Sequence, residues 1–278
     1  MSQRDLSLGG TFNDVAADYD RFRPRYPGAV FDDLAAELGL DASSRILEVG
    51  CGPGVATEAM ISRGWSVLAV EPGAELARLA RAKFDPRHFT LEESTFDEWD
   101  PGERRFDLVV SAQAFHWVAP ELRWERAAAA LVEGGALALV SNEALAEGSF
   151  FDVMESSRQW REEWGVDDGE TFTWRALRRL VEEFSSDIGA LWEALSPQGS
   201  AVRAGASFAP PEVRLYPWSA TYSTVEALGL LATYSRYLAM DPGRRETLFE
   251  RLGALIERDY GGVLERPYAT VVAVARRR

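Results

Sequence analysis

The segment 46–57 reads ILEVGCGPGVAT, and it decides the fold of the chain. An apolar run that contains Glu48 breaks into Gly50, Gly52 and Gly54, and a helix-compatible stretch follows at 55–63. The order is strand, glycine turn, helix. Glycines let a main chain approach a ligand where a Cβ would clash, and a helix N-terminus offers free N–H groups at the same place. The segment therefore predicts a site for a nucleotide-like or carboxylate-bearing small molecule.

The spacing of the glycines narrows the ligand class. The dinucleotide fingerprint is G-x-G-x-x-G, whereas the spacing here is G-x-G-x-G and Val55 occupies the third-glycine position. A phosphate-binding P-loop requires a lysine after its glycines, and no lysine follows them here. Glu71 ends the next apolar run, 66–70, and an acid there can accept both hydroxyls of a ribose. The ligand is expected to have an adenosine-like ribose, and a dinucleotide oxidoreductase is the disfavoured alternative.

Four blocks of the sequence then occur in register between residues 45 and 141. They are EVGCGPG at 48–54, VEP at 70–72, FDLVVS at 106–111 and LVEGGAL at 131–137. With these blocks the chain resembles the class I S-adenosylmethionine-dependent methyltransferases, in the small-molecule branch similar to the trans-aconitate methyltransferases. The resemblance implies S-adenosyl-L-methionine as cofactor and S-adenosyl-L-homocysteine as product. No cluster of His, Cys and acids has metal-ligand spacing, so no metal is expected.

Strands that alternate with helices predict an α/β fold with a doubly wound, mostly parallel, seven-stranded, Rossmann-like sheet. Ligands of such sheets bind outside the carboxyl ends of the strands. The resemblance implies that the last strand runs antiparallel. The expected strands are 45–49, 66–70, 88–92, 106–111, 136–141, 212–219 and 268–275, and the expected helices are 55–63, 74–84, 120–132, 224–240 and 244–260.

The predicted domain organisation has a core that is interrupted by an insertion. Residues 1–144 and 211–278 are expected to form the cofactor-binding core, with 1–44 as a helical lid. Residues 145–210 carry four tryptophans and apolar residues at helical spacing, and the resemblance implies that such an insertion caps the substrate. An insertion that folds as a separate domain is the alternative.

Composition excludes several classes of protein. Apolar residues make up 46% of the chain, enough for a buried core, and the net charge of −14 disfavours a nucleic-acid partner. A single cysteine fits a reducing compartment. No signal peptide and no run near the about 20 apolar residues of a membrane span are recognisable. We expect a soluble, cytoplasmic monomer or homodimer, with Arg276, Arg277 and Arg278 as a solvated tail.

The resemblance assigns the cofactor contacts to residues in the matching blocks. An acid is common in relatives where Thr95 stands, so Thr95, the Phe96 main chain or a shifted Asp97 would contact the adenine. Tyr19 and Arg23 would bind the methionine carboxylate, and a solvated helix end is their alternative. Glu71 could instead cap a helix, and Cys51 could be a small filler. The predicted cofactor-binding residues are Tyr19, Arg23, Glu48, Gly50, Cys51, Gly52, Gly54, Glu71, Pro72, Thr95, Phe96, Ser111 and Gln113.

Methyl transfer is an in-line displacement, so orientation supplies much of the rate and a base is needed only for a protonated acceptor. His116 follows the fourth predicted strand and is the candidate catalytic base; a pocket wall is its alternative role. The other histidine, His88, is expected on the surface. The candidate substrate-binding residues are Trp117, Tyr216, Trp218 and Tyr222, although most of these aromatics could belong to the core.

The sequence predicts methyl transfer to a small-molecule acceptor, at a carboxylate or hydroxyl oxygen by family analogy. C-methylation of an aromatic, indole-like or isoprenoid natural-product intermediate is the second reading, motivated by nine tryptophans and a large insertion. A non-catalytic binding module on the same fold is an alternative of another class. The intact glycines together with Glu48 and Glu71 argue against it.

Overall fold

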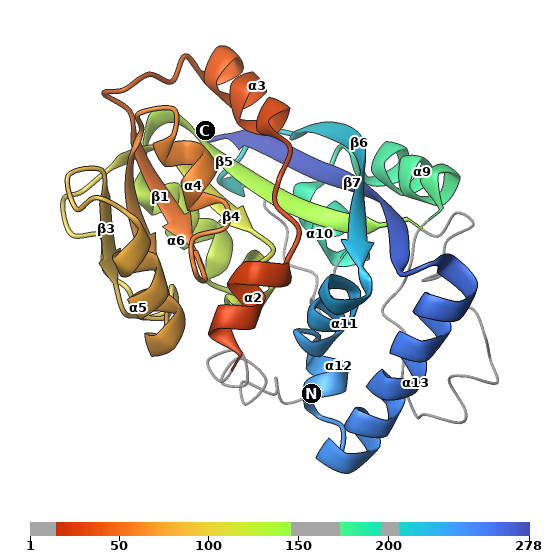
Figure 1. Ribbon diagram of the computed structural model, residues 1–278. Helices are drawn as coiled ribbons and strands as arrows, with labels where there is room; N and C mark the ends of the chain where they lie inside the picture. Colours follow the sequence, from red (N-terminus) through yellow and green to blue (C-terminus); the bar gives the residue numbers. More distant parts are fainter. Residues whose placement is uncertain (1–14, 146–172, 196–205) are drawn as a thin grey trace. The chain divides into compact units, whose positions relative to one another are not determined.

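The computed structural model describes residues 15–145, 173–195 and 206–278. Figure 1 shows the order of its helices and strands. They are α2 (Ala16–Phe22), α3 (Gly28–Leu38), β1 (Arg45–Val49), α4 (Thr57–Ile61), β2 (Ser66–Val70), α5 (Ala74–Lys83), β3 (Phe89–Glu92), β4 (Phe106–Ala112), η1 (Phe115–Trp117), α6 (Arg123–Ala130), β5 (Leu131–Ala144), α9 (Trp174–Phe184), α10 (Ile188–Leu195), β6 (Glu212–Ser223), α11 (Thr224–Ala232), α12 (Ser235–Leu238), α13 (Pro242–Tyr260) and β7 (Val263–Arg276).

The strands form one seven-stranded sheet in the order β3-β2-β1-β4-β5-β7-β6. Strand β1 pairs in parallel with β2 and β4, β2 with β3, and β4 with β5. Strand β7 runs antiparallel to β5, because Arg277 N bonds Gly135 O while Leu145 N bonds Pro267 O. The α/β fold class and the antiparallel last strand are therefore confirmed.

The described residues divide into two compact units. Among the described residues, the sheet unit comprises 25–142, 176–195, 206–216 and 270–278, and the helix-rich unit comprises 15–24, 143–145, 173–175 and 217–269. Each unit has its own apolar core. The predicted boundaries at 144, 145, 210 and 211 differ from this division, and the role of 145–210 as a substrate cap stays a prediction.

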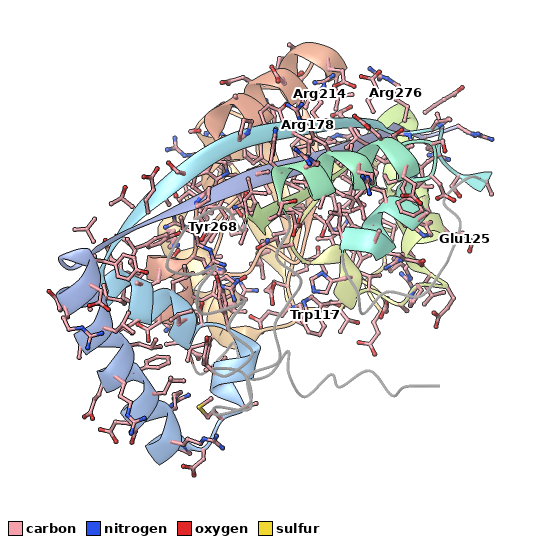
Figure 2. The ribbon with its side chains drawn as sticks, turned by 90° about the vertical axis from the view of Figure 1, so that its right-hand side faces the viewer. Trp117, Glu125, Arg178, Arg214, Tyr268 and Arg276 are labelled. Atoms are coloured by element: carbon pink, nitrogen blue, oxygen red, sulfur yellow. The ribbon has the colours of Figure 1, made fainter. Side chains whose placement is uncertain are left out.

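The core of the sheet unit lies between the central strands and their helices. Strands β1 and β4 are buried at nearly every position, as expected for strands covered on both faces. Helix α3 is held by the last strands through Glu37. Arg214 of β6 makes an ion pair with the Glu37 carboxylate at 2.7 Å, and Arg276 of β7 donates to the Glu37 main-chain oxygen at 3.0 Å. Figure 2 labels both arginines.

The helix-rich unit shows capping signals that agree with its sequence. Ser223 and Glu226 form a capping box at the start of α11. Asp241 caps α13 ahead of Pro242, and Gly261 ends that helix with a φ of 64°. These signals explain why the two helices begin and end where they do.

Several predicted boundaries were wrong for local reasons. Helix α4 covers only Thr57–Ile61 rather than 55–63, because the turn after Gly54 consumes two residues before the helix begins. Strand β5 begins at Leu131 rather than 136, and the predicted helix 120–132 is correspondingly shorter. Leu131 already pairs with Phe106 ahead of a register shift, and Gly134, with a φ of 74°, lets the strand continue.

The predicted helix 224–240 breaks at Thr233. The Thr233 hydroxyl donates to Leu230 O, and the Arg23 guanidinium takes the Thr233 main-chain oxygen. This tertiary contact thus uses the Thr233 main-chain oxygen, which would accept an intrahelical hydrogen bond in a continuous helix. Strand β3 begins one residue later than predicted, and β6 and β7 are longer than predicted.

The predicted insertion contains two helices in its described segment 173–195. Helices α9 and α10 lie within 145–210, and Leu177 and Val181 are buried on one face of α9. The predicted tryptophans Trp160 and Trp164 lie outside the described residues. Across 15–145, 173–195 and 206–278, no helix has both the length and the apolar character needed to cross a bilayer.

Candidate functional site

The glycine loop between β1 and α4 uses its three glycines in two ways. Gly50, Gly52 and Gly54 all have positive φ, at 71°, 54° and 91°. A Cβ on Gly50 would lie 2.4 Å from the Ala114 Cβ, and one on Gly54 would lie 2.3 Å from the Phe84 ring. A Cβ on Gly52 would meet nothing within 4 Å. Two glycines therefore allow close packing of the loop, and Gly52 faces open space.

Glu71 follows β2, and its carboxylate links the glycine loop to the loop after β2. One carboxylate oxygen accepts from Gly52 N at 2.9 Å and the other from Gly73 N at 2.8 Å. The residue is only 6% exposed. Burial raises the pKa of the Glu71 carboxyl, and the two main-chain N–H donors partly offset that shift. The carboxylate is thus fixed beside Gly52, with further acceptor lone pairs.

Glu48 lies in β1 and is 1% exposed. Its carboxylate accepts a 2.5 Å hydrogen bond from the Thr57 hydroxyl at the start of α4. Burial raises the pKa of Glu48 to about 7, the Thr57 bond lowers it, and the negative charge of Glu71 adds to the rise. Glu48 therefore connects β1 to α4 from inside the fold and changes charge near neutral pH.

Cys51 is buried in the loop, and its thiol donates to Gly52 O at 3.3 Å. Burial raises the pKa of the Cys51 thiol well above its ordinary value, which keeps the thiol protonated. A protonated thiol is a poor nucleophile. Pro72, next to Glu71, is exposed.

The carboxyl end of β4 is tied to both neighbouring strands. The Ser111 hydroxyl donates to Val49 O of β1 at 2.9 Å. Gln113 has a φ of 54°, alone among the described non-glycine residues in being positive. Its main-chain N donates to Val140 O, and its side-chain amide donates to Asn142 O at 2.9 Å. These bonds hold the corner through which the chain enters η1.

His116 and Trp117 lie in η1, directly after that corner, with ring centroids 4.9 Å apart. Both side chains are half-buried. Phe115 is completely buried and packs on Trp124 of α6, with ring centroids 5.0 Å apart. This contact anchors η1 to α6. Figure 2 labels Trp117 in the sheet unit.

The predicted adenine-contact segment follows β3. Phe96 is buried and stacks on Trp99 at 5.9 Å. Thr95 is exposed, and its hydroxyl accepts from Glu98 N at 3.3 Å. Asp97 accepts a hydrogen bond from Ala119 N at 2.9 Å, so this carboxylate already has a main-chain partner.

Four predicted site residues lie in the helix-rich unit. The Arg23 guanidinium bonds the Thr233 hydroxyl and main-chain oxygen, both at 2.9 Å, and lies over the Tyr19 ring at 4.7 Å. Trp218 stacks on Tyr268 at 4.7 Å. The hydroxyls of Tyr222 and Tyr268 lie 3.0 Å apart.

Tyr216 belongs to the sheet unit. Its hydroxyl donates to the Asp33 carboxylate at 2.7 Å. Burial and the negative charge of Asp33 raise the pKa of Tyr216 to about 12. Tyr216 also packs against the core cluster of that unit.

The sheet unit thus brings the glycine loop, Glu71, Ser111, Gln113 and His116 to the carboxyl ends of β1, β2 and β4, where ligands of such sheets bind. Sequence reasoning missed three contributors. They are Thr57 beneath the loop, Phe84 against Gly54, and Asn142, whose side-chain oxygen accepts from Thr270 at 2.6 Å. In the sequence Asn142 follows a long apolar run, and this position was the signal that could have identified it as a site residue. The described ranges contain no group of three or more His, Cys, Asp or Glu that could hold a metal ion.

Comparison with known proteins places this geometry in a family. The methyltransferase domain matches residues 19–185, more than half of the chain. The chain belongs to the methyltransferase-domain family. The resemblance found in the sequence and the assignment as an enzyme are confirmed by this match.

Curated relatives of the chain agree with this family. An uncharacterized methyltransferase of Mycobacterium tuberculosis is 36% identical over 141 residues, which cover 51% of this chain and 55% of that protein. A trans-aconitate 2-methyltransferase of Rhodopseudomonas palustris is 33% identical over 135 residues, 46% of this chain and 51% of that protein. The chain spans about half the length of the curated relatives it matches.

Solved structures support the fold of the methyltransferase. A proposed type II methyltransferase from Anaeromyxobacter dehalogenans superimposes with a TM-score of 0.62 at 20% identity, over 92% of this chain and 98% of that one. A proposed methyltransferase from an antibiotic biosynthesis pathway of Anabaena variabilis gives 0.54 at 16% identity, over 88% and 96%.

Proposed function

We propose that this methyltransferase takes its methyl group from S-adenosyl-L-methionine and transfers it to an oxygen atom of a small acceptor. The observation that carries the proposal is the Glu71 carboxylate, which is buried and fixed by Gly52 N and Gly73 N beside the open face of Gly52. A carboxylate at the end of the second strand of such a sheet suits the two hydroxyls of a ribose.

The residues present fit that cofactor. Open space at Gly52 gives room for a ligand against the main chain. Glu71 would accept the ribose hydroxyls, and the main chain at Thr95 and Phe96 would lie along the adenine. The positive charge of a sulfonium favours a site with two buried carboxyl groups, Glu48 and Glu71. The cofactor contacts of Tyr19 and Arg23 stay a prediction.

S-adenosyl-L-methionine supplies an electrophilic methyl group on a sulfonium when it is bound. The protein then has to orient the acceptor and exclude water. The corner at Gln113 fixes η1, and η1 presents the half-buried His116. His116 would take the proton of a hydroxyl acceptor in its neutral form. A carboxylate acceptor is already ionised and needs no base.

Oxygen is the favoured acceptor atom because the relative from Rhodopseudomonas palustris is a trans-aconitate 2-methyltransferase, and trans-aconitate is a carboxylic acid. This support covers about half of each chain. Methylation at carbon of an aromatic compound is the second candidate. The half-buried Trp218, which stacks on Tyr268, favours it, since apolar aromatic surfaces suit aromatic ligands.

The test is a transfer assay with S-adenosyl-L-methionine labelled in its methyl group, and with separate panels of carboxylic acids, phenols and indoles. The proposal predicts labelled methyl esters or ethers, identified by mass spectrometry and by base lability of the esters. Label in a carbon–carbon bond of an indole or isoprenoid would replace the oxygen assignment by the second candidate. A cytoplasmic location and a monomeric or dimeric state stay predictions.

A further inference from the structure

The connection from β3 to β4 leaves part of the sheet face uncovered. Parallel strands are usually joined by helices that cover the sheet, as α4, α5 and α6 do here. Residues 93–105 contain no helix. As a result Ser66 and Leu68 of β2 are only half-buried and Thr90 of β3 is exposed, whereas their alternate neighbours Val67 and Phe89 are buried in the core cluster of the sheet unit.

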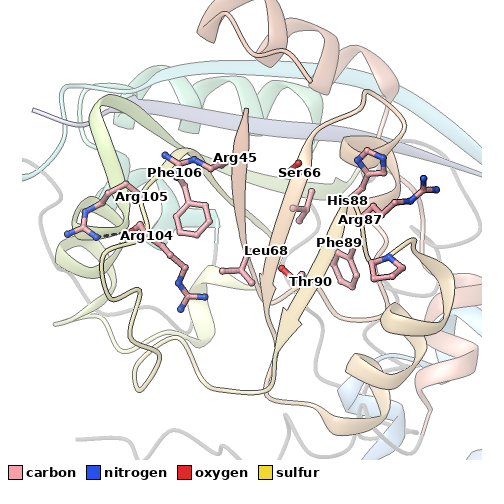
Figure 3. A pocket seen from close by; sticks show the side chains of 12 residues that line it. Arg45, Ser66, Leu68, Arg87, His88, Phe89, Thr90, Arg104, Arg105 and Phe106 are labelled. Atoms are coloured by element: carbon pink, nitrogen blue, oxygen red, sulfur yellow. Dashed lines mark hydrogen bonds between the residues drawn. The ribbon is translucent and has the colours of Figure 1, made fainter. Parts of the chain in front are cut away.

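A hollow of about 230 Å³ lies over this face (Figure 3). It is formed at the amino ends of the strands, since Arg45 begins β1 and Ser66 begins β2. The glycine loop lies at the carboxyl ends of the same strands. The hollow is therefore distinct from the proposed cofactor site. Its lining is Arg45, Ser66, Val67, Leu68, Pro86, Arg87, His88, Phe89, Thr90, Arg104, Arg105 and Phe106.

Cationic side chains surround the hollow in a protein whose net charge is −14. Two of the arginines are neutralised, since Arg87 pairs with Asp85 and Arg104 pairs with Glu92. Within the described part of the chain, the Arg105 guanidinium bonds only main-chain oxygens, those of Gly102 and Arg104.

Arg45 has its side chain exposed, and only its main-chain N reaches a carboxylate, that of Asp107. Among the described residues no carboxylate pairs with the guanidinium of Arg45 or Arg105.

We propose that this hollow binds a small organic oxyanion, with a phosphate monoester as the leading class. Guanidinium groups present planar pairs of donors that match phosphate and carboxylate oxygens, and the hydroxyls of Ser66 and Thr90 add donors. Leu68 and Phe106 offer apolar contact to a short carbon skeleton. The volume is below the about 300–1,000 Å³ typical of larger ligands. The site is independent of methyl transfer.

The test is a titration of the full chain, with leucine methyl groups isotopically labelled, followed by NMR at constant ionic strength. Glycerol phosphate and citrate are the two probes. The proposal predicts a saturable shift of the Leu68 methyl signals and no shift for Leu137, which is buried in β5. Saturation by glycerol phosphate assigns a phosphate ligand, and saturation by citrate alone assigns a polycarboxylate. Both results support an oxyanion site.

Variants separate a specific site from general attraction. The pair Arg45→Ala/Arg105→Ala is expected to weaken binding about tenfold or more, since it removes charge-assisted hydrogen bonds. The matched pair Arg175→Ala/Arg179→Ala removes the same charge from exposed positions of α9 outside the hollow and is expected to leave the affinity unchanged. Arg45→Glu alone disrupts no described side-chain hydrogen bond, and it must also weaken binding. This variant tests the proposal if Arg105→Ala disturbs the turn that contains Arg105.

Three results would overturn the proposal. The first is the absence of a saturable Leu68 shift with either probe. The second is equal weakening in both pairs of variants, which would indicate only diffuse charge attraction. The third is a wild-type dimer in sedimentation velocity that dissociates in Arg45→Glu, because the hollow would then be an interface between two copies of the chain.

Discussion

The side-chain amide of Gln113 donates a hydrogen bond to the main-chain oxygen of Asn142 across 2.9 Å. This bond joins the end of β4 to the end of β5 at the residue whose φ is 54°. A non-glycine residue pays about 1–2 kcal/mol for a left-handed conformation, and such strain is characteristic of functional sites. Gln113 thus holds a strained corner in place before His116.

Replacing Gln113 separates the strain from the bond. Gln113→Ala keeps the backbone strain and loses the hydrogen bond, so we expect a loss of about 1 kcal/mol in the free energy of unfolding. Gln113→Gly loses the same bond but relieves the strain, so its stability should lie closer to wild type. Urea unfolding of the three proteins measures both effects. A glycine variant less stable than the alanine variant would refute the strained-corner interpretation.

Gly54 and Gly52 of the loop should respond differently to alanine. Gly54→Ala would force a Cβ to within 2.3 Å of the Phe84 ring, and overpacking with positive φ predicts a loss of about 3 kcal/mol or more. Gly52→Ala meets no protein atom, so about 1–2 kcal/mol is expected. Its Cβ occupies space that we assign to the cofactor, so affinity for S-adenosylhomocysteine should fall.

A double-mutant cycle checks the packing part of that prediction. In a Phe84→Ala background, Gly54→Ala should cost less than in wild type, because the ring that it would strike is gone. Equal costs in both backgrounds would show that the Phe84 contact does not require the glycine. Unchanged S-adenosylhomocysteine affinity in Gly52→Ala would exclude the open face of Gly52 from the cofactor site.

Glu48 should make stability depend on pH. The folded protein keeps the Glu48 proton up to about pH 7, whereas the ordinary value is 4.5. Unfolding therefore releases a proton between these values, and stability falls as the pH rises through this window. Glu48→Gln still accepts from Thr57 but cannot ionise. The variant should gain about 3 kcal/mol relative to wild type between pH 4.5 and 8.

Urea unfolding of wild type and Glu48→Gln from pH 4.5 to 8 measures that difference directly. Other titrating groups contribute to both proteins and cancel in the comparison. Parallel stability curves would mean that Glu48 has an ordinary pKa in the folded protein.

The role of His116 depends on the acceptor. With a hydroxyl acceptor, His116→Ala should lower kcat about a hundredfold or more, the usual contribution of a general base, and leave S-adenosylhomocysteine affinity unchanged. With a carboxylate acceptor kcat should change little. Steady-state kinetics with one acceptor of each class distinguishes the two. Wild-type kcat with both would leave His116 as a wall of the pocket.

The sequence predicted the sheet because its signals were local. The blocks at 48–54 and 70–72 each contain the end of an apolar strand, and the block at 106–111 lies within β4. The start of β5 and the break at Thr233 could not be predicted in this way. The first depends on pairing with Phe106, and the second on Arg23, which is 210 residues away in the chain.

The candidate site was predictable to the same extent. The position of Glu71 at the end of β2 followed from its place after an apolar run. Its two N–H donors and the partner of Glu48, Thr57, required the fold of the loop. The sequence left open whether Asp97 contacts the adenine. In the structure the Asp97 carboxylate accepts a hydrogen bond from Ala119 N. Such partners lie at no fixed spacing in the sequence, so no local pattern predicts them.

Calorimetric titration with S-adenosylhomocysteine, for wild type, Glu71→Ala and Glu75→Ala, is the most direct test of the central claim. Glu75 is an exposed acid of the next helix and serves as the matched control. We expect one-to-one binding to wild type and to Glu75→Ala. In Glu71→Ala binding should weaken about a hundredfold or more, because two charge-assisted hydrogen bonds to the ribose are lost and each is worth about 1.5–3 kcal/mol. Absence of binding to wild type, or equal affinity in a folded Glu71→Ala variant, would contradict the account.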